Sequence, residues 1–183
     1  MQNFRPGVIE RMGLGEEQLR KVAPNLIVVS ISGFGDTGPY SQRPVYDPLI
    51  QGLSGLATVQ AGADELRPQL VRTILPDKLT GVTAAQAITA ALFARERTGE
   101  PQHVRLSMLD ATIAFFWSSD MVSQTFVHSD VPPPEAARLH ALIHAPTTAY
   151  ITIAVPIARH LHALLRALTR PAREADPPPT HAN

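Results

Sequence analysis

The 183-residue sequence contains no cysteine and has a net charge of zero. The lack of cysteine excludes disulfides, thiolate catalysis and cysteine-ligated zinc or iron–sulfur sites. Sixteen basic residues balance sixteen acidic ones, so the chain has no excess positive charge for nucleic acid or an anionic membrane. Long apolar runs are also missing, since no stretch approaches the ~18 apolar residues of a membrane span. These absences favour a soluble, cytoplasmic protein without nucleic-acid or membrane partners.

Glycine is missing from the whole chain after Gly99, although eleven glycines lie at or before that residue. Six of the seven histidines and nine of the seventeen prolines lie at or after residue 128. A folded α/β domain needs glycine at turns and helix C-caps. We therefore expect a globular domain over residues 1–128, a Pro-rich linker over 129–148 and a poorly structured extension over 149–183.

Strands and helices alternate in the first part of the chain, which is typical of an α/β fold with a parallel sheet. The apolar run 26–31 predicts a strand buried on both faces, and the alternating run 103–108 predicts a strand with one buried face. The helices are predicted as two short pieces within 6–22, one from Asp47 to about residue 56, one over 78–97 and one over 109–126. In the extension, 149–155 predicts a strand and 159–168 a helix.

Gly33, Gly35 and Gly38 form a G-x-G-x-x-G pattern directly after the first predicted strand. A dinucleotide site needs a helix to begin at such a loop, so that its N-terminal amides meet the pyrophosphate. Pro39 follows at once and disfavours that helix. We expect these glycines to form tight turns and to let the backbone approach a ligand or a helix.

Two aspartates stand where helices are predicted to begin. Asp77 precedes the 78–97 helix and Asp47 precedes Pro48, so each is predicted to cap its own helix. For Asp77 the same geometry has a functional interpretation, because a helix dipole favours an ionised carboxylate that can act as a nucleophile. His140 and His144 have helical i, i+4 spacing, but no third ligand is evident and no metal site is predicted.

Three groups of motifs follow one another in order over about residues 1–127. They are QNFRPG at 2–7 with RMGLG at 11–15, SGFGDTGPY at 32–40 with YDP at 46–48, and PDKLTG at 76–81 leading to RTG at 97–99. Together these motifs resemble the family III CoA-transferases (CaiB/BaiF type), which include formyl-CoA transferase, carnitine CoA-transferase and α-methylacyl-CoA racemase. The resemblance implies a nucleotide-binding-like parallel sheet flanked by helices, the large domain of that family.

The resemblance also implies a mechanism in which Asp77 attacks an acyl-CoA thioester. A mixed aspartyl anhydride and then an aspartyl-CoA thioester would carry CoA to a small carboxylic acid, so acyl-CoA and the acid are substrates and no metal or permanently bound cofactor is needed. Family members form interlocked homodimers. The other positions that match the family are the CoA contacts Asn3, Phe4, Arg5 and Arg11, and Tyr46, Asp47 and the Gly33–Gly38 loop beside the active site.

Family members are about twice as long as this chain, so the resemblance implies an incomplete large domain, with residues 149–183 as a remnant of the small domain and a disordered tail. Several functions stay open: an active CoA-transferase, an inactive truncated remnant, an acyl-CoA racemase, or a chain complemented by another polypeptide.

In the racemase branch a histidine occupies the position of Tyr46. Because tyrosine has an ordinary pKa near 10 and shuttles protons poorly at neutral pH, we expect a transferase rather than a racemase.

Overall fold

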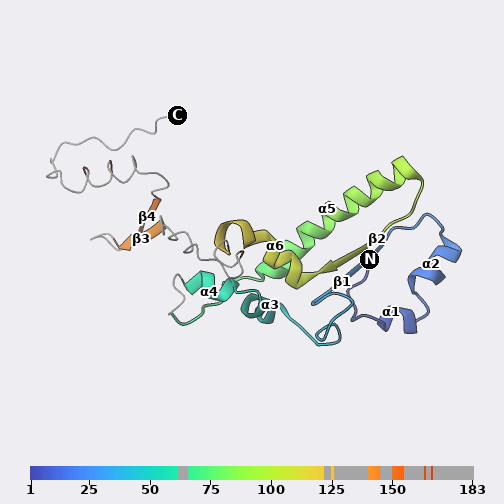
Figure 1. Cartoon of the computed structure of the whole chain (residues 1–183), viewed down its shortest axis with the longest axis horizontal. Coiled ribbons are helices and arrows are strands. Elements are labelled where there is room, and N and C mark those ends of the chain that lie inside the picture. Colours follow the sequence, from blue (N-terminus) through green and yellow to red (C-terminus); the bar gives the residue numbers. More distant parts are fainter. Residues whose placement is uncertain are drawn as a thin grey trace. The chain divides into compact units, whose positions relative to one another are not determined.

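The computed structural model describes residues 1–61, 66–121, 125, 140–144, 150–154, 163 and 166. The chain divides into two compact units, Met1–Asp130 and Val131–Asn183. In the first unit (Figure 1) the elements are α1 (Val8–Arg11), α2 (Glu16–Val22), β1 (Val28–Ser32), α3 (Asp47–Leu53), α4 (Leu56–Ala61), α5 (Leu75–Thr98), β2 (His103–Ser107) and α6 (Met108–Asp120).

Strand β1 is paired on both of its edges. It runs parallel to β2, and on its other edge Gln2 forms a parallel bridge to Ser30. The Gln2 N–H donates to the Val29 carbonyl at 2.9 Å, and the Gln2 carbonyl accepts from the Ile31 N–H at 3.0 Å. The parallel pairing confirms the predicted α/β fold, and the bridge places Asn3 at the carboxyl end of β1.

The two faces of this small sheet differ in polarity. Residues opposite one another in a parallel pair project from the same face. Ser30 therefore shares a face with Arg105, its register partner, and with His103, whose ring contacts Ser30. Since this face is polar, the prediction that β1 is buried on both faces is only partly right: Val28 and Val29 are buried, and the rest of the strand is half-buried.

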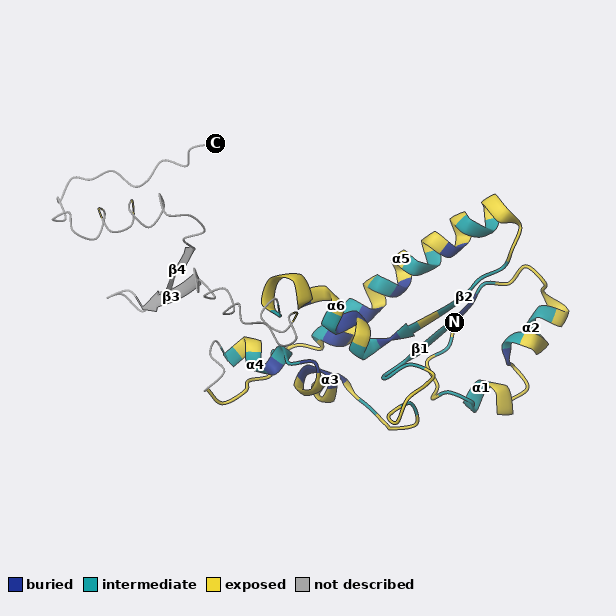
Figure 2. Cartoon of the chain, viewed as in Figure 1, coloured by how far each residue is buried: buried dark blue, intermediate teal, exposed yellow. Residues whose placement is uncertain are grey.

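Helix α5 packs against β2 and α6 through small side chains. Thr80, Ala84 and Ala91 recur at helical spacing and are at most 6% exposed. The large apolar side chains of Val82 and Phe93 are 69% and 66% exposed instead. Figure 2 shows buried and exposed residues alternating along α5. Small residues on the buried face let the helix backbones approach closely, as the alanine-rich sequence predicts.

Several helix predictions need correction. The helix predicted over 78–97 begins at Leu75, so Asp77 lies in its first turn and is not its cap. Pro76 explains the difference, since proline is compatible with the first turn of a helix. The helix predicted from Asp47 to about residue 56 ends at Leu53, and α4 follows as a separate element that no sequence pattern indicated.

The second unit contains an antiparallel hairpin of β3 (His140–His144) and β4 (Tyr150–Ala154). Strand β4 confirms the strand predicted at 149–155, whereas β3 lies in the range for which only a Pro-rich linker is predicted. Residues 163 and 166 are helical, and the rest of the predicted 159–168 helix lies outside the described residues. The domain boundaries at 128 and 148 stay predictions.

Gly33, directly after β1, has no room for a side chain. A Cβ atom there would lie 2.0 Å from Cγ1 of Val45, far inside van der Waals contact. We expect Gly33→Ala to lower the free energy of unfolding by about 1–3 kcal/mol, because Val45 or the loop must move. Urea unfolding followed by far-UV circular dichroism measures the effect.

Gly52→Ala is the matched control for this prediction. A Cβ atom at Gly52 meets no atom within 4 Å, and the residue lies inside α3, where alanine is the better helix former. This control should be at least as stable as the unmodified chain. A Gly33→Ala protein with unchanged stability would contradict the steric argument.

Candidate active site

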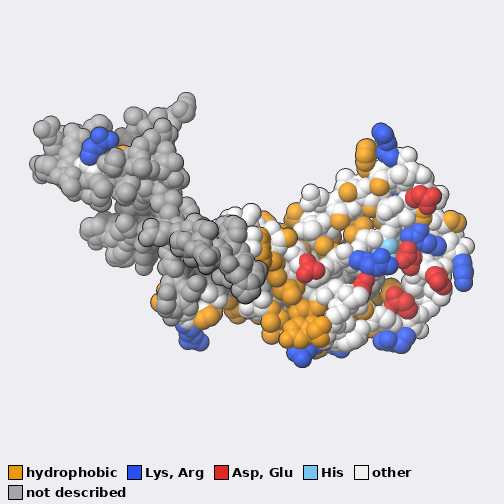
Figure 3. Space-filling view, viewed as in Figure 1, with side chains coloured by type: hydrophobic (Ala, Val, Ile, Leu, Met, Phe, Trp, Pro, Cys, Tyr) orange, Lys and Arg blue, Asp and Glu red, His pale blue; other side chains and the backbone are white. Residues whose placement is uncertain are grey.

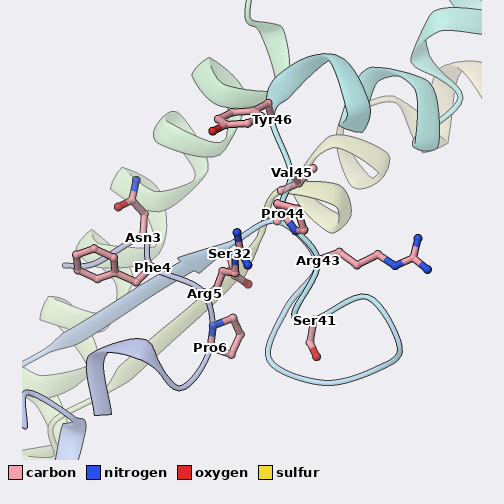
Figure 4. Close-up of a pocket in the computed structure, with 11 residues that line it drawn as sticks. Asn3, Phe4, Arg5, Pro6, Ser32, Ser41, Arg43, Pro44, Val45 and Tyr46 are labelled. Atoms are coloured by element: carbon pink, nitrogen blue, oxygen red, sulfur yellow. The ribbon is translucent and has the colours of Figure 1, made fainter. Parts of the chain in front are cut away.

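Two adjoining cavities open at the carboxyl end of β1. The larger, of about 470 Å³, reaches Asp77 and Thr80 on α5, and the smaller, of about 190 Å³, lies between segments 3–6 and 41–46 (Figure 4). Ligands of parallel α/β sheets bind beyond the carboxyl ends of the strands. The residues that line both cavities, and so make them one groove, are Asn3, Ser32, Gly33, Val45 and Tyr46.

The carboxylate of Asp47 is buried, with 3% of the residue exposed. Its Oδ2 accepts a hydrogen bond from the backbone N–H of Asp77 at 3.1 Å, and its Oδ1 accepts one from Nε2 of Gln51 at 2.6 Å. Asp47 thus satisfies a free N–H in the first turn of α5 from a different helix. The prediction that it caps its own helix is wrong, because the N-cap of α3 is Tyr46.

Gln51, which is 2% exposed, fixes the segment that leads into α5. Its Oε1 accepts from the Val71 N–H at 2.8 Å, and its Nε2 also donates to the Thr73 carbonyl at 3.1 Å. The amide therefore holds residues 71–73 against α3 and helps to place Asp77. Sequence reasoning missed Gln51, although its i, i+4 spacing from Asp47 is the spacing of contacting residues on a helix.

Asp77 lies exposed at the groove surface, yet the pKa of its carboxyl is raised above the ordinary value. Partial burial of the carboxyl is the main cause, and the negative charge of Asp47 adds to it. This direction is opposite to the one expected from the helix dipole. The reason is that partial burial, together with the second carboxylate that Asp47 places at the same helix terminus, disfavours the ionised form.

The structure brings most of the predicted site residues together along the groove. Those that line it are Asn3, Phe4, Arg5, Gly33, Tyr46, Asp47 and Asp77. Arg11 lies exposed on α1 and lines neither cavity, and the same is true of Gly35 and Gly38 in the loop. The φ angles of these two glycines are 83° and 86°, so both serve turns, and no helix begins in the loop before Asp47.

Arg43 is a site residue that sequence reasoning missed. It lines the smaller cavity, and its guanidinium lies 4.3 Å from the centre of the Tyr40 ring. The Phe34 ring meets Tyr40 edge-on, with 5.5 Å between centroids, and stiffens this part of the loop. The only indication of this position in the sequence is that Arg43 is an arginine in the loop that leads back to the groove.

No three His, Cys, Asp or Glu side chains are placed to hold a metal ion in the described part of the chain. Within those same residues, no helix has both the length and the apolar character required to cross a lipid bilayer.

The sequence of residues 1–182 matches the model of CoA-transferase family III. The chain belongs to this family. The match extends well past residue 127, where the recognisable motifs end, so the glycine-free extension is family III sequence too. The motifs alone do not extend the resemblance this far, because the extension carries none of the three motif groups.

Two curated members of family III and one solved structure illustrate the similarity. Acetyl-CoA:oxalate CoA-transferase of Acetobacter aceti is 44% identical over 114 residues, 62% of this chain and 29% of the relative. Succinate–glutarate CoA-transferase of Agrobacterium fabrum is 34% identical over 140 residues, 76% of this chain and 34% of the relative. A CAIB/BAIF family protein from Brucella suis aligns with a TM-score of 0.72 and 31% identity over 91% of this chain and 44% of that one. The chain spans about a third of the length of these curated relatives.

Replacement of Asp47 tests its buried hydrogen bonds. In Asp47→Asn, one acceptor oxygen becomes an NH₂ group that faces either the Asp77 N–H or the Gln51 amide. We expect the free energy of unfolding to fall by about 1–3 kcal/mol, because a buried donor is left without an acceptor. Urea unfolding at neutral pH measures the change, and stability equal to that of the unmodified chain would contradict the prediction.

Replacement of Asp77 should have the opposite effect on stability. Because its carboxyl pKa is higher in the folded chain, the ionised form is disfavoured by folding above the ordinary aspartate pKa of about 3.9. Asp77→Asn should therefore stabilise the fold at neutral pH, and the gain should shrink as pH falls and Asp77 becomes protonated. Urea midpoints between about pH 4 and pH 7 measure this trend, with Asp120→Asn, at an exposed aspartate ending α6, as the charge-matched control. A loss of stability at neutral pH would contradict the prediction.

Proposed function

We propose that the chain transfers CoA between an acyl-CoA and a carboxylic acid, with Asp77 as the nucleophile. The observation that carries the proposal is the position of Asp77 on the lining of a cavity of about 470 Å³ that Asn3, Tyr46 and Asp47 also line. Membership of family III and similarity to oxalate and succinate–glutarate CoA-transferases support it.

The first half of the proposed reaction takes CoA from the donor. A carboxylate oxygen of Asp77 attacks the thioester carbon, the C–S bond breaks and CoA leaves as the thiolate, so that a mixed anhydride forms on Asp77. The thiolate then attacks the aspartyl carbonyl carbon. The donor acid leaves as its carboxylate, and Asp77 carries CoA as a thioester.

The second half reverses these steps with the acceptor acid. The acceptor carboxylate attacks the aspartyl thioester and releases the CoA thiolate, which then attacks the acceptor acyl carbon of the new anhydride. The products are the acceptor acyl-CoA and the free Asp77 carboxylate. Each step exchanges one activated acyl group for another, so a single carboxylate suffices and no redox group takes part.

The electrostatics of the site favour acylation of Asp77. Burial and the charge of Asp47 disfavour the ionised Asp77 carboxylate, as its raised pKa shows. Both the anhydride and the thioester at Asp77 are uncharged, so each removes the repulsion from Asp47. The same neighbour that raises the energy of the free carboxylate therefore lowers the relative energy of the covalent intermediates.

The smaller cavity is the proposed site of the CoA phosphates and adenine. Arg5 and Arg43 supply positive charge there, and Phe4, which is 47% exposed, offers an aromatic face. Guanidinium groups bind phosphate oxygens through paired hydrogen bonds. Arg11 on α1 stays a predicted CoA contact, and a homodimer stays part of the proposal because family III enzymes assemble in that way.

The cavity composition favours CoA transfer over racemisation. Racemisation at the carbon beside a thioester needs a second acid–base group, and no described residue that lines the Asp77 cavity is a histidine. The alternative of an inactive remnant differs from an active enzyme only in turnover. Trapping of the acylated aspartate separates these two.

Chemical trapping tests Asp77 as the nucleophile. We expect incubation with succinyl-CoA or oxalyl-CoA, followed by hydroxylamine, to leave a hydroxamate on Asp77, because hydroxylamine cleaves both the anhydride and the thioester at the aspartyl carbonyl. Peptide mass spectrometry locates the modification. Asp77→Asn should show no modification, since an amide does not attack a thioester.

The matched control for trapping is Asp120→Asn, which keeps the proposed nucleophile and removes an exposed carboxylate. It should be modified on Asp77 to the same extent as the unmodified chain. A hydroxamate on another residue would remove the proposed mechanism. A folded chain that forms none would establish the inactive alternative.

A further inference from the structure

Away from the groove, side chains from β1, β2 and α2 form a continuous hydrogen-bonded relay. The Ser30 Oγ lies 2.9 Å from Nε2 of His103, and Nδ1 of the same ring lies 2.5 Å from Oε2 of Glu16. Serine, histidine and carboxylate joined in this order are the groups that activate a serine in many hydrolases, where the constellation is recognised by geometry and not by sequence order.

The carboxylate of Glu16 is the acidic end of the relay. Burial of Glu16 raises its carboxyl pKa, but the bond and charge of His103 together with those of Arg20 outweigh this and lower the pKa overall. Arg20 holds the second oxygen at 2.6 Å. When the His103 ring is neutral, an ionised Glu16 accepts a hydrogen bond from its Nδ1–H, which leaves the Nε2 lone pair directed at the Ser30 hydroxyl. This is the tautomer that a general base requires.

The relay opens into a cavity of about 490 Å³ that Ser30, His103 and Glu16 line. Arg105 also lines it and projects from the same sheet face as Ser30, its register partner. Its guanidinium is fixed by Nε to Asp36 at 3.1 Å and by a longer contact to Glu16 at 3.4 Å. A fixed cation beside the serine can stabilise the oxyanion that forms when a hydroxyl adds to a carbonyl.

Acidic side chains dominate the rest of this cavity, where Glu10, Glu17 and Asp36 lie among the lining residues. Figure 3 shows charged side chains of both signs over the α1–α2 end of the unit. This excess of carboxylates disfavours an anionic molecule such as CoA and favours a neutral or cationic one. The cavity thus differs in charge from the proposed phosphate site and contains none of the residues of the Asp77 cavity.

We propose that Ser30, His103 and Glu16 form a second catalytic site that hydrolyses small carboxylic esters of neutral or cationic alcohols. The Ser30 Oγ attacks the ester carbon while His103 Nε2 takes the hydroxyl proton. The bond to the alcohol oxygen breaks, and this oxygen receives the proton from Nε2, so that the alcohol leaves and an acyl-Ser30 ester stays. Water, deprotonated by His103, then attacks this ester and releases the acid and the free serine.

This activity is independent of CoA transfer, and its test is too. The full chain is treated with a fluorescent alkyl fluorophosphonate, which reacts with serines that a neighbouring base activates. We expect peptide mass spectrometry to find the adduct on Ser30. We also expect p-nitrophenyl acetate, a small neutral ester, to be hydrolysed by the same preparation.

Variants test whether Ser30 reacts because it belongs to the relay or only because it is an accessible serine. Ser30→Ala should lose the adduct, and His103→Gln should lower the rate of labelling about 100-fold, as expected for the loss of a general base. Ser119→Ala removes an exposed serine that has a carboxylate neighbour but no histidine, and it should be labelled on Ser30 at the unmodified rate. Asp77→Asn should also be labelled normally, which distinguishes failure here from failure of the CoA-transfer proposal.

Two results would overturn the proposal. One is the absence of an adduct on Ser30 in the unmodified chain, whose far-UV circular dichroism shows that it is folded. The other is an equal rate of Ser30 labelling in His103→Gln and in the unmodified chain, because the reactivity of Ser30 would then not depend on the relay.

Discussion

The buried carboxylate of Asp47 joins the two helices on which the groove depends. One oxygen accepts the Asp77 backbone N–H in the first turn of α5, and the other is bound by Gln51, which also holds residues 71–73. These bonds hold the first turn of α5, which carries Asp77, against α3. Asp47 also contributes to the electrostatics of Asp77, because its charge adds to partial burial, the main cause, in raising the pKa of the Asp77 carboxyl. The residue that helps to position Asp77 therefore also affects its charge.

Strand β1 borders both proposed sites, one at its carboxyl end and the other on one face of the sheet. Along its axis it ends in Ser32 and Gly33, where the Gln2 bridge brings Asn3 alongside and the groove opens. Perpendicular to the strand, the Ser30 side chain projects from the polar face of the sheet. Helix α2 contacts this face through Glu16. A parallel sheet is commonly covered by apolar residues on both faces. Here the period of two residues along a strand separates an apolar face from a face with hydrogen-bonding groups.

Local patterns predicted the local parts of this molecule. The α/β alternation, the parallel strands and the approximate position of α5 follow from apolar runs and from helix start and stop signals. Most of the site residues predicted from the motif groups line the groove. Contacts between distant segments were not predictable in this way. No sequence spacing indicates that Asp47 binds the Asp77 N–H, 30 residues away, or that Glu16 meets His103, 87 residues away. The role of Asp47 at the first turn of α5 was missed for this reason, since a hydrogen-bond acceptor supplied by another helix leaves no sequence signature.

The contacts also explain why Asp77, and not Asp47, is suited to attack a thioester. Both carboxyls line the same cavity. Both oxygens of Asp47 are engaged in hydrogen bonds and the residue is 3% exposed, so acylation would break the bonds that hold α5. No hydrogen bond to the Asp77 carboxyl is found among the residues that the structure describes, and Asp77 is an exposed residue on the lining of the groove. Acylation of Asp77 therefore leaves the hydrogen bonds that hold α5 intact, whereas acylation of Asp47 would break them.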